Sequence, residues 1–361
     1  MQDNKKRIYG LDLIRFIAAI MVVIFHYSYR GFQADNLTLM HIDDISMIGK
    51  YGHLGVQLFF MISGFVIMMS AHHGSVAKFF ISRVSRLYPA FILCCTITFI
   101  VISFFNDNPS LFVSTKDYII NLSMLAGFIG VPSVDGVYWS LYVEIYFYFL
   151  VAIILICGQI KRAEYLLYLW MVFSLLAWYF DNGILKKLTI SNYSIYFIAG
   201  GFLYYSWNIG FNLRRIMSII TCCVISSISA IKYNEYMRNY YGDNFSDLIT
   251  VVTVISFYVL MSCIIFFNIK WLSNPLFMKL GAITYPLYLL HQKIGYIFFN
   301  HLHGEVNKYI LFVSIVCFMI FISYVIGNHI EPRLSGMLKL SLTKKLILKK
   351  SGCNEERLNK I

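Results

Sequence analysis

Three ionisable side chains interrupt the first long apolar run of the chain, residues 11–29: Asp12, Arg15 and His26. In an α-helix, the step from Arg15 to His26 turns roughly 1100°, about three full turns, and rises roughly 16 Å. Both side chains therefore share one face, and Asp12 can pair with Arg15 one turn away. A neutral imidazole at the far end is suited to general-base chemistry. The alternative is that Arg15 snorkels to a membrane surface and His26 only packs.

A carboxylate, Glu144, lies inside a second apolar segment, in the stretch YWSLYVEIYFYF. Ser140, Glu144 and Tyr148 follow four-residue steps, so they share one helical face. A carboxylate at this depth must be paired, protonated or in contact with water, which makes it a functional candidate. Its depth is comparable to that of His26, so we expect it to orient the imidazole as the acid does in a catalytic triad. The alternative is a purely structural bond to a neighbouring helix.

A third polar group comprises Tyr288, His291 and Gln292, spaced three and four residues apart in GAITYPLYLLHQKIGY. These side chains lie on one helical face, whereas Lys293 points roughly opposite to His291. They form either part of a site or a satisfied polar cluster. In the stretch LFFMISGFVI, Ser63 is a small residue that lets helices approach closely, so packing is its default role.

Two arginines, Arg83 and Arg86, lie three residues apart in RVSRLYP, before the expected start of a membrane helix at Pro89. Guanidinium groups at this spacing can form a fork for phosphate oxygens. The alternative is the excess of Lys and Arg that cytoplasmic loops of membrane proteins carry.

Composition identifies the solvent in which the chain folds. Of 361 residues, 59% are hydrophobic and 13% are charged, and the mean hydropathy is +0.68. The apolar residues fall in blocks of about twenty, the length of a membrane-spanning helix. The net charge of +12 is concentrated in short loops and at the C-terminus, which fits membrane topology and argues against nucleic-acid binding. The sequence predicts an all-α polytopic membrane protein.

Neither cysteines nor histidines suggest a metal site. Most of the eight cysteines lie in apolar segments without a CxxC spacing, so we expect buried free thiols. The pairs His72 with His73 and His301 with His303 lack further ligands at useful spacing. We therefore expect no metal.

We expect about ten transmembrane helices, at residues 11–29, 51–71, 89–106, 137–158, 164–180, 193–208, 214–231, 247–268, 281–300 and 309–330. An even number places both termini on one side. Most Lys and Arg residues fall on the side of the N-terminus, so that side is predicted to be cytoplasmic. The expected location is a bacterial inner membrane, where the lipid bilayer is a partner and a homo-oligomer is compatible with the sequence.

Two further segments stand apart from the spans. Residues 106–136 are long and partly apolar, and we expect a re-entrant or interfacial element on the outer side that could act as a lid. We assign residues 1–335 to one transmembrane domain and residues 336–361 to a basic cytoplasmic tail that lies on anionic headgroups.

Five pieces occur in order along nearly the whole chain: LDLIRFIAAIMVVIFH, FFMISGF, RVSRLYP, YWSLYVE and YPLYLLH. Together they resemble the acyltransferase-3 family of integral membrane O-acyltransferases. The resemblance implies transfer of an acyl group, commonly acetyl, from cytoplasmic acyl-CoA to a hydroxyl of a carbohydrate, such as a cell-surface glycan or its lipid-linked precursor. Some relatives carry a fused hydrolase-like SGNH domain after the last helix, and we expect none here.

The resemblance and the residue patterns together define the expected site. Acyl-CoA is a co-substrate and no cofactor is permanently bound. The catalytic residues are His26 and Glu144. Residues for acyl-CoA are Arg15, Arg83 and Arg86, and supporting residues are Asp12, Ser63, Trp139, Ser140, Tyr288 and His291. The alternative function is a carrier or flippase of a glycan or acyl intermediate, without transfer chemistry of its own.

Overall fold

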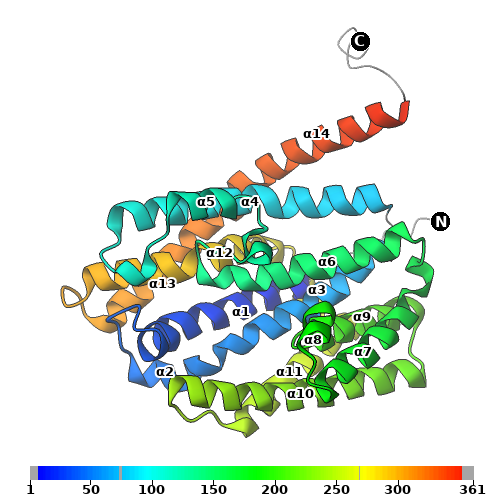
Figure 1. Cartoon of the computed structure of the whole chain (residues 1–361), viewed down its shortest axis with the longest axis horizontal. Coiled ribbons are helices and arrows are strands. Elements are labelled where there is room, and N and C mark those ends of the chain that lie inside the picture. The colour runs from blue at the N-terminus through cyan, green and yellow to red at the C-terminus, as the bar shows by residue number, and fades with distance from the viewer. Residues whose placement is uncertain (1–6, 73–74, 268, 352–361) are drawn as a thin grey trace.

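The computed structural model describes residues 7–72, 75–267 and 269–351. The chain is 84% helix, and no strand occurs in these three ranges. Figure 1 shows the helices joined by loops and short turns. The α-helices are α1 (Tyr9–Phe25), α2 (Asp43–Gly49), α3 (Gly55–His72), α4 (Val76–Phe105), α5 (Thr115–Asn121), α6 (Trp139–Ile156), α7 (Ala163–Tyr179), α8 (Gly183–Thr189), α9 (Ser194–Ile209), α10 (Leu213–Tyr241), α11 (Asp247–Phe266), α12 (Phe277–Leu302), α13 (Lys308–Val325) and α14 (Glu331–Ser351). The predicted all-α class is confirmed.

Within the described ranges, seven helical segments are long and apolar enough to cross a membrane: Tyr9–Gln33, Asp43–His72, Val76–Phe105, Gly136–Ile156, Leu213–Tyr241, Asp247–Phe266 and Lys308–Ile347. The other three predicted spans, 164–180, 193–208 and 281–300, coincide with α7, α9 and α12. Helices α7 and α9 have 17 and 16 residues, fewer than the ~20 of a typical membrane-spanning helix. Helix α12 has 26 residues but is not among the seven apolar segments. The predicted count of ten is therefore not confirmed.

The centre of the bundle consists of α1, α3, α9 and α12. Helix α1 packs against α3 and α12, and α3 packs along α9. The Asp43–His72 segment is 78% buried, against 28% for Gly136–Ile156, so the latter lies at the periphery. At Gly64 of α3, an added Cβ would lie 2.2 Å from the carbonyl oxygen of Phe197 in α9. The packing role expected for the small residues of this stretch is thus observed at Gly64.

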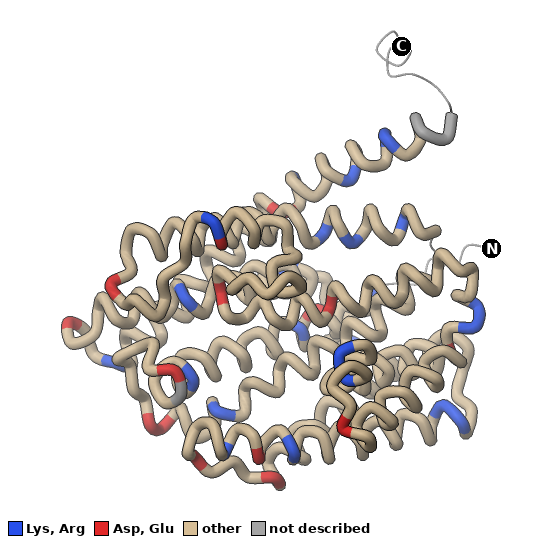
Figure 2. Tube along the Cα trace, in the orientation of Figure 1, with Lys and Arg blue, Asp and Glu red and all other residues tan. Residues whose placement is uncertain are grey.

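The peripheral helices present apolar side chains outward, for example Phe149, Val252 and Phe321, which are 58%, 57% and 64% exposed. Figure 2 shows charged residues mainly towards the helix ends, with long uncharged stretches between them. An outward apolar surface of this kind suits lipid and would be unfavourable in water.

Helix α4 differs from the prediction. It begins at Val76 and passes through Pro89 to Phe105. Ser75 is its N-cap residue, and the Ser75 side chain accepts a hydrogen bond from the Lys78 N–H. The prediction that a helix starts at Pro89 was therefore wrong. Proline removes one N–H and disfavours the helix, but the tertiary packing of a long helix can absorb that cost. Arg83 and Arg86 consequently lie within a helix.

The 106–136 segment folds into short helices only: η3 (Pro109–Leu111), α5, η4 (Ala126–Ile129) and η5 (Gly136–Tyr138). Helix α5 packs on α4, and η5 packs on α12. At the other terminus, α14 extends away from the bundle in Figure 1. The predicted tail from residue 336 begins inside α14, and residues 352–361 lie outside the described ranges.

Candidate active site

Two histidines meet in the centre of the bundle. Helix α1 ends at Phe25, and a π-helical turn, η1 (His26–Ala34), continues it from His26; such turns are frequent at functional sites. His26 and His291 are 5% and 0% exposed, and Nδ1 of His26 lies 3.2 Å from Nε2 of His291. The sequence analysis listed His291 as a supporting residue. Its contact with His26 could not be predicted, because it depends on how α12 packs against the first helix.

The hydrogen-bond network assigns the tautomers of both rings. Nδ1 of His26 lies 2.8 Å from the carbonyl oxygen of Val22, and Nδ1 of His291 lies 3.1 and 2.9 Å from those of Leu287 and Tyr288. A carbonyl oxygen only accepts, so each Nδ1 carries the proton. The single N–H of His26 is therefore shared between the carbonyl oxygen of Val22 and Nε2 of His291, and both of these atoms accept. Nε2 of His26 then has the lone pair, and within the described ranges no hydrogen bond reaches it. This is the protonation pattern of a general base held by a second imidazole.

Glu144 does not lie against His26. Its Oε1 accepts hydrogen bonds from the hydroxyls of Ser63, at 2.7 Å, and Tyr148, at 2.5 Å. The bond from Tyr148 bears out the predicted shared face of α6. The expected pairing of Glu144 with His26 is replaced by the His291 contact, because α6 faces α3 at this position and the partner at the imidazole comes from α12.

Asp12 is shared unequally between two arginines. Arg7 binds it in a bidentate way, with Nε to Oδ2 at 2.8 Å and NH2 to Oδ1 at 3.0 Å. Arg15 NH1 lies 3.9 Å from Oδ1. The predicted Asp12–Arg15 ion pair is present but is the weaker of the two, because bidentate pairs have the better geometry. The guanidinium of Arg15 remains available for another anion.

Three cavities follow one another along the bundle. The proximal cavity, about 440 Å³, lies at the start of α1 and is lined by Arg7, Asp12, Arg15, Arg86, Tyr285 and Glu331 among others. The middle cavity, about 90 Å³, shares Arg15, Arg86 and Tyr285 with it and adds Ser63, Ser140 and Glu144. The distal cavity, about 630 Å³, shares Tyr288 with the middle one and includes His26.

Tyr288 and Ser140 mark the junction of the middle and distal cavities. Their hydroxyl oxygens are 2.7 Å apart, and the Tyr288 hydroxyl also donates to the carbonyl of Val137 at 3.1 Å. Both residues were predicted to support the site. Because Tyr288 lies one turn before His291 and their ring centroids are 5.8 Å apart, the junction adjoins the histidine pair.

The two arginines of α4 have different surroundings. Arg86 lines the proximal and middle cavities with Arg15. Arg83 is buried between the rings of Phe79 and Tyr148, with its guanidinium carbon 5.9 Å from each centroid. The structure therefore brings Arg86 and Arg15 together at the cavities, in place of the expected fork of Arg83 and Arg86. A three-residue step turns about 300°, enough to direct the two side chains differently.

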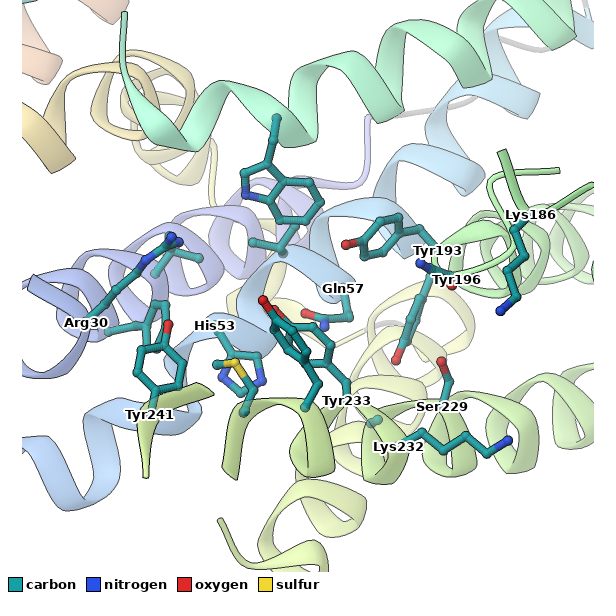
Figure 3. Close-up of a pocket in the computed structure, with 18 of the residues that line it drawn as sticks. Arg30, His53, Gln57, Lys186, Tyr193, Tyr196, Ser229, Lys232, Tyr233 and Tyr241 are labelled. Atoms are coloured by element: carbon teal, nitrogen blue, oxygen red, sulfur yellow. The ribbon is translucent and has the colours of Figure 1, made fainter. Parts of the chain in front are cut away.

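The distal cavity is rich in aromatic rings, including the predicted Trp139. Figure 3 shows the hydroxyls of Tyr193 and Tyr233 and the amide of Gln57 directed into one space, with Arg30 at one end. At the other end are Lys186 and Lys232, and the ammonium of Lys232 lies 4.5 Å from the Trp178 ring centroid. A hydrogen bond from Lys186 lowers the pKa of the neighbouring Asp181. Sequence reasoning missed this wall because its residues come from α7 to α10, which carry no compact motif.

In the part of the chain that the structure describes, no three His, Cys, Asp or Glu side chains gather as a metal site requires. His73, one of the histidines discussed above, lies outside the described ranges. The polar groups of the site are hydroxyls, imidazoles, guanidinium groups and the carboxylates of Asp12, Glu144 and Glu331. Guanidinium groups suit anion binding, and imidazoles suit proton transfer.

Comparisons with known proteins point to one family. A family model described as an acyltransferase domain, of the acyltransferase-3 family, matches residues 8–328. A protein of Acidianus two-tailed virus named "Putative acetyltransferase ORF330" is 23% identical over 281 residues, and the match covers 73% of this chain and 80% of the viral one. No solved structure matches the chain. The family match covers α1 to α13 and includes the polar residues named for the three cavities except Arg7 and Glu331. The chain belongs to the acyltransferase-3 family of membrane acyltransferases.

Proposed function

We propose that the protein transfers an acyl group, most simply acetyl, from acyl-CoA in the proximal cavity to a carbohydrate hydroxyl in the distal cavity. The observation that carries this proposal is the position of His26. His26, whose Nε2 has the free lone pair, lines the distal cavity. This cavity adjoins the middle and proximal cavities, which are lined by Arg15 and Arg86.

The donor fits the proximal and middle cavities by charge and by size. Arg15 and Arg86 supply two guanidinium groups for the phosphates of the nucleotide. The middle cavity, at about 90 Å³, suits a thin pantetheine arm with a short acyl group better than a nucleotide or a long acyl chain. The thioester would then arrive at the Tyr288–Ser140 junction, close to His26.

The transfer step uses residues already described. Nε2 of His26 takes the proton of the acceptor hydroxyl as its oxygen attacks the thioester carbonyl. The carbon–sulfur bond breaks, the CoA thiolate leaves, and the imidazolium proton can return to it. The hydrogen bond from Nδ1 of His26 to His291 orients the ring and is strengthened by the positive charge that His26 gains. Glu144, placed in the middle cavity by Ser63 and Tyr148, balances the charge of the two arginines in this scheme.

The acceptor assignment rests on the lining of the distal cavity. Sugar rings stack their C–H faces on aromatic side chains and use hydroxyls and amides for orientation, and this cavity offers both kinds of group. The volume of about 630 Å³ suits part of a glycan. We assign the proximal side to the cytoplasm, where acyl-CoA is found, because Lys and Arg residues are in excess on that side. We assign the membrane itself to a bacterial inner membrane.

The experiment measures acetyl transfer by the purified protein in detergent. The donor is labelled acetyl-CoA, and the acceptor is a glycan fraction from the surface of the cells that make the protein. We expect release of CoA thiol together with base-labile label on the glycan. Folded protein that binds the glycan but releases no thiol and moves no label would indicate a carrier and would contradict the proposal.

A further inference from the structure

The 106–136 segment reaches into α12 through one carboxylate. Asp135 is 0% exposed. Its Oδ1 accepts from the Val137 N–H at 3.2 Å, and its Oδ2 accepts from the Lys293 N–H at 3.0 Å. The first bond caps η5, but the second reaches an amide in the interior of another helix, where the usual partner is a carbonyl of the same helix. Capping alone therefore does not account for Asp135.

Two further side chains hold the same turn of α12. The Tyr27 hydroxyl donates to the carbonyl of His291 at 2.6 Å, and the Tyr138 hydroxyl lies 3.4 Å from the carbonyl oxygen of Leu289. With Asp135 on the Lys293 N–H, backbone groups at three alternate residues are bound from outside the helix. The position of this turn is consequently set by η1, by η5 and by Asp135 as well as by the helix itself.

His291 lies at the centre of this turn. Because its Nδ1 donates to carbonyls of its own helix, at Leu287 and Tyr288, the ring moves with the backbone. Its Nε2 is 3.2 Å from Nδ1 of His26, already near the upper limit for a hydrogen bond. A displacement of about 1 Å would break the contact, and displacements of this size can reduce catalysis about 10²-fold.

Two other contacts keep the segment close to α12. The ammonium of Lys293 donates to the carbonyl of Leu111 at 3.2 Å, which explains a lysine that the sequence left without a role. At Gly136, an added Cβ would lie 2.7 Å from Oε1 of Gln292, so a residue without a side chain allows this close approach. The segment is thus joined to α12 at its start and at its end.

We propose that Asp135 is a positioning residue, which fixes the turn of α12 that carries His291 and so aligns His26 for proton transfer. The inference rests on the proposed function for its effect on turnover. Its effect on the histidine pair does not depend on which substrates the protein uses. Burial raises the pKa of Asp135 to about 6, although the two N–H groups and the Lys293 ammonium act to lower it. Both oxygens are needed as acceptors, and an asparagine provides only one.

The test compares Asp135→Asn and Asp135→Ala with Ser114→Ala, in full-length protein purified in detergent. Ser114 caps α5 within the same segment, and in the described ranges its hydroxyl bonds only to Asp117, so its loss is a matched control for segment stability. With acetyl-CoA as the probe, we expect kcat to fall roughly 10-fold for Asn and roughly 10²-fold for Ala, and KM for acetyl-CoA to change less than about twofold. Ser114→Ala should keep the kcat of the unaltered protein.

Nitrogen NMR of ¹⁵N-histidine-labelled protein provides a readout that is independent of turnover. Signals are assigned with His26→Gln and His291→Gln. We expect Asp135→Asn to change the Nε2 signal of His291 and the Nδ1 signal of His26, and Ser114→Ala to change neither. Unchanged signals and kcat in Asp135→Asn would overturn the proposal.

If Asp135→Asn does not fold, Tyr27→Phe removes the bond to the His291 carbonyl and must produce the same two changes. Unchanged histidine signals in Tyr27→Phe would then overturn the proposal. Altered signals in a protein that shows no acetyl transfer would support the positioning role and contradict only the proposed function.

Discussion

If His291 acts through His26 alone, replacing both should cost no more than replacing His26. We consider His26→Ala, which removes the base, and His291→Phe, which fills the fully buried site of His291 with a ring that cannot accept a hydrogen bond. Loss of a general base lowers kcat about 10²- to 10⁴-fold. A hydrogen bond to a charged group contributes about 1.5–3 kcal/mol, so His291→Phe should lower kcat about 10- to 160-fold.

The double variant separates the two models. Independent residues would multiply their effects to a loss of about 10³- to 10⁶-fold, whereas residues acting as a unit give the loss of His26→Ala alone. The assay is thiol release from acetyl-CoA at saturating acceptor, for the four proteins of the cycle. His301→Phe is the control, because His301 lies on the same helix, is half exposed and pairs with Asp107, away from the histidine pair; we expect less than a twofold change. Multiplicative losses would refute the coupling and assign His291 a contact with substrate.

Three further predictions follow from the cavities and the membrane orientation. Arg86→Ala should raise the KM for acetyl-CoA roughly 10-fold with little change in kcat, while Arg83→Ala should reduce folded yield. Equal increases in KM for the two variants would instead support phosphate binding by both arginines. Arg15→Lys, which keeps the charge but loses the planar donor group, should retain yield better than acetyl-CoA affinity, and the opposite pattern in a binding titration would contradict phosphate binding by Arg15. An impermeant thiol reagent added outside cells should label Asp35→Cys but not Ser75→Cys, and the reverse labelling would overturn the proposed orientation.

The sequence was sufficient for properties that depend on local periodicity. The common face of Ser140, Glu144 and Tyr148 follows from four-residue steps within one helix, and all three side chains line the middle cavity. The all-α class and the approximate positions of the central helices follow from apolar blocks of membrane length.

Properties that depend on which helices are neighbours could not be predicted. Matching depth made Glu144 a reasonable partner for His26, but the partner comes from α12, and no pattern within α6 or α12 encodes that contact. The closer ion pair of Asp12 is with Arg7 and depends on the path of the chain just before α1, where Ile8 is extended. Asp135 precedes a recognisable motif but has no periodic relation to Lys293, so only the folded chain reveals their bond.

The most direct test of the proposed mechanism is acetyl transfer by the purified His26→Ala variant, measured beside its affinity for acetyl-CoA. We expect acetyl-CoA still to bind, because the arginines that hold it lie in the proximal cavity, while transfer of labelled acetyl to glycan falls about 10²-fold or more. Near-normal transfer by folded His26→Ala would contradict the assignment of His26 as the base and with it the mechanism proposed here.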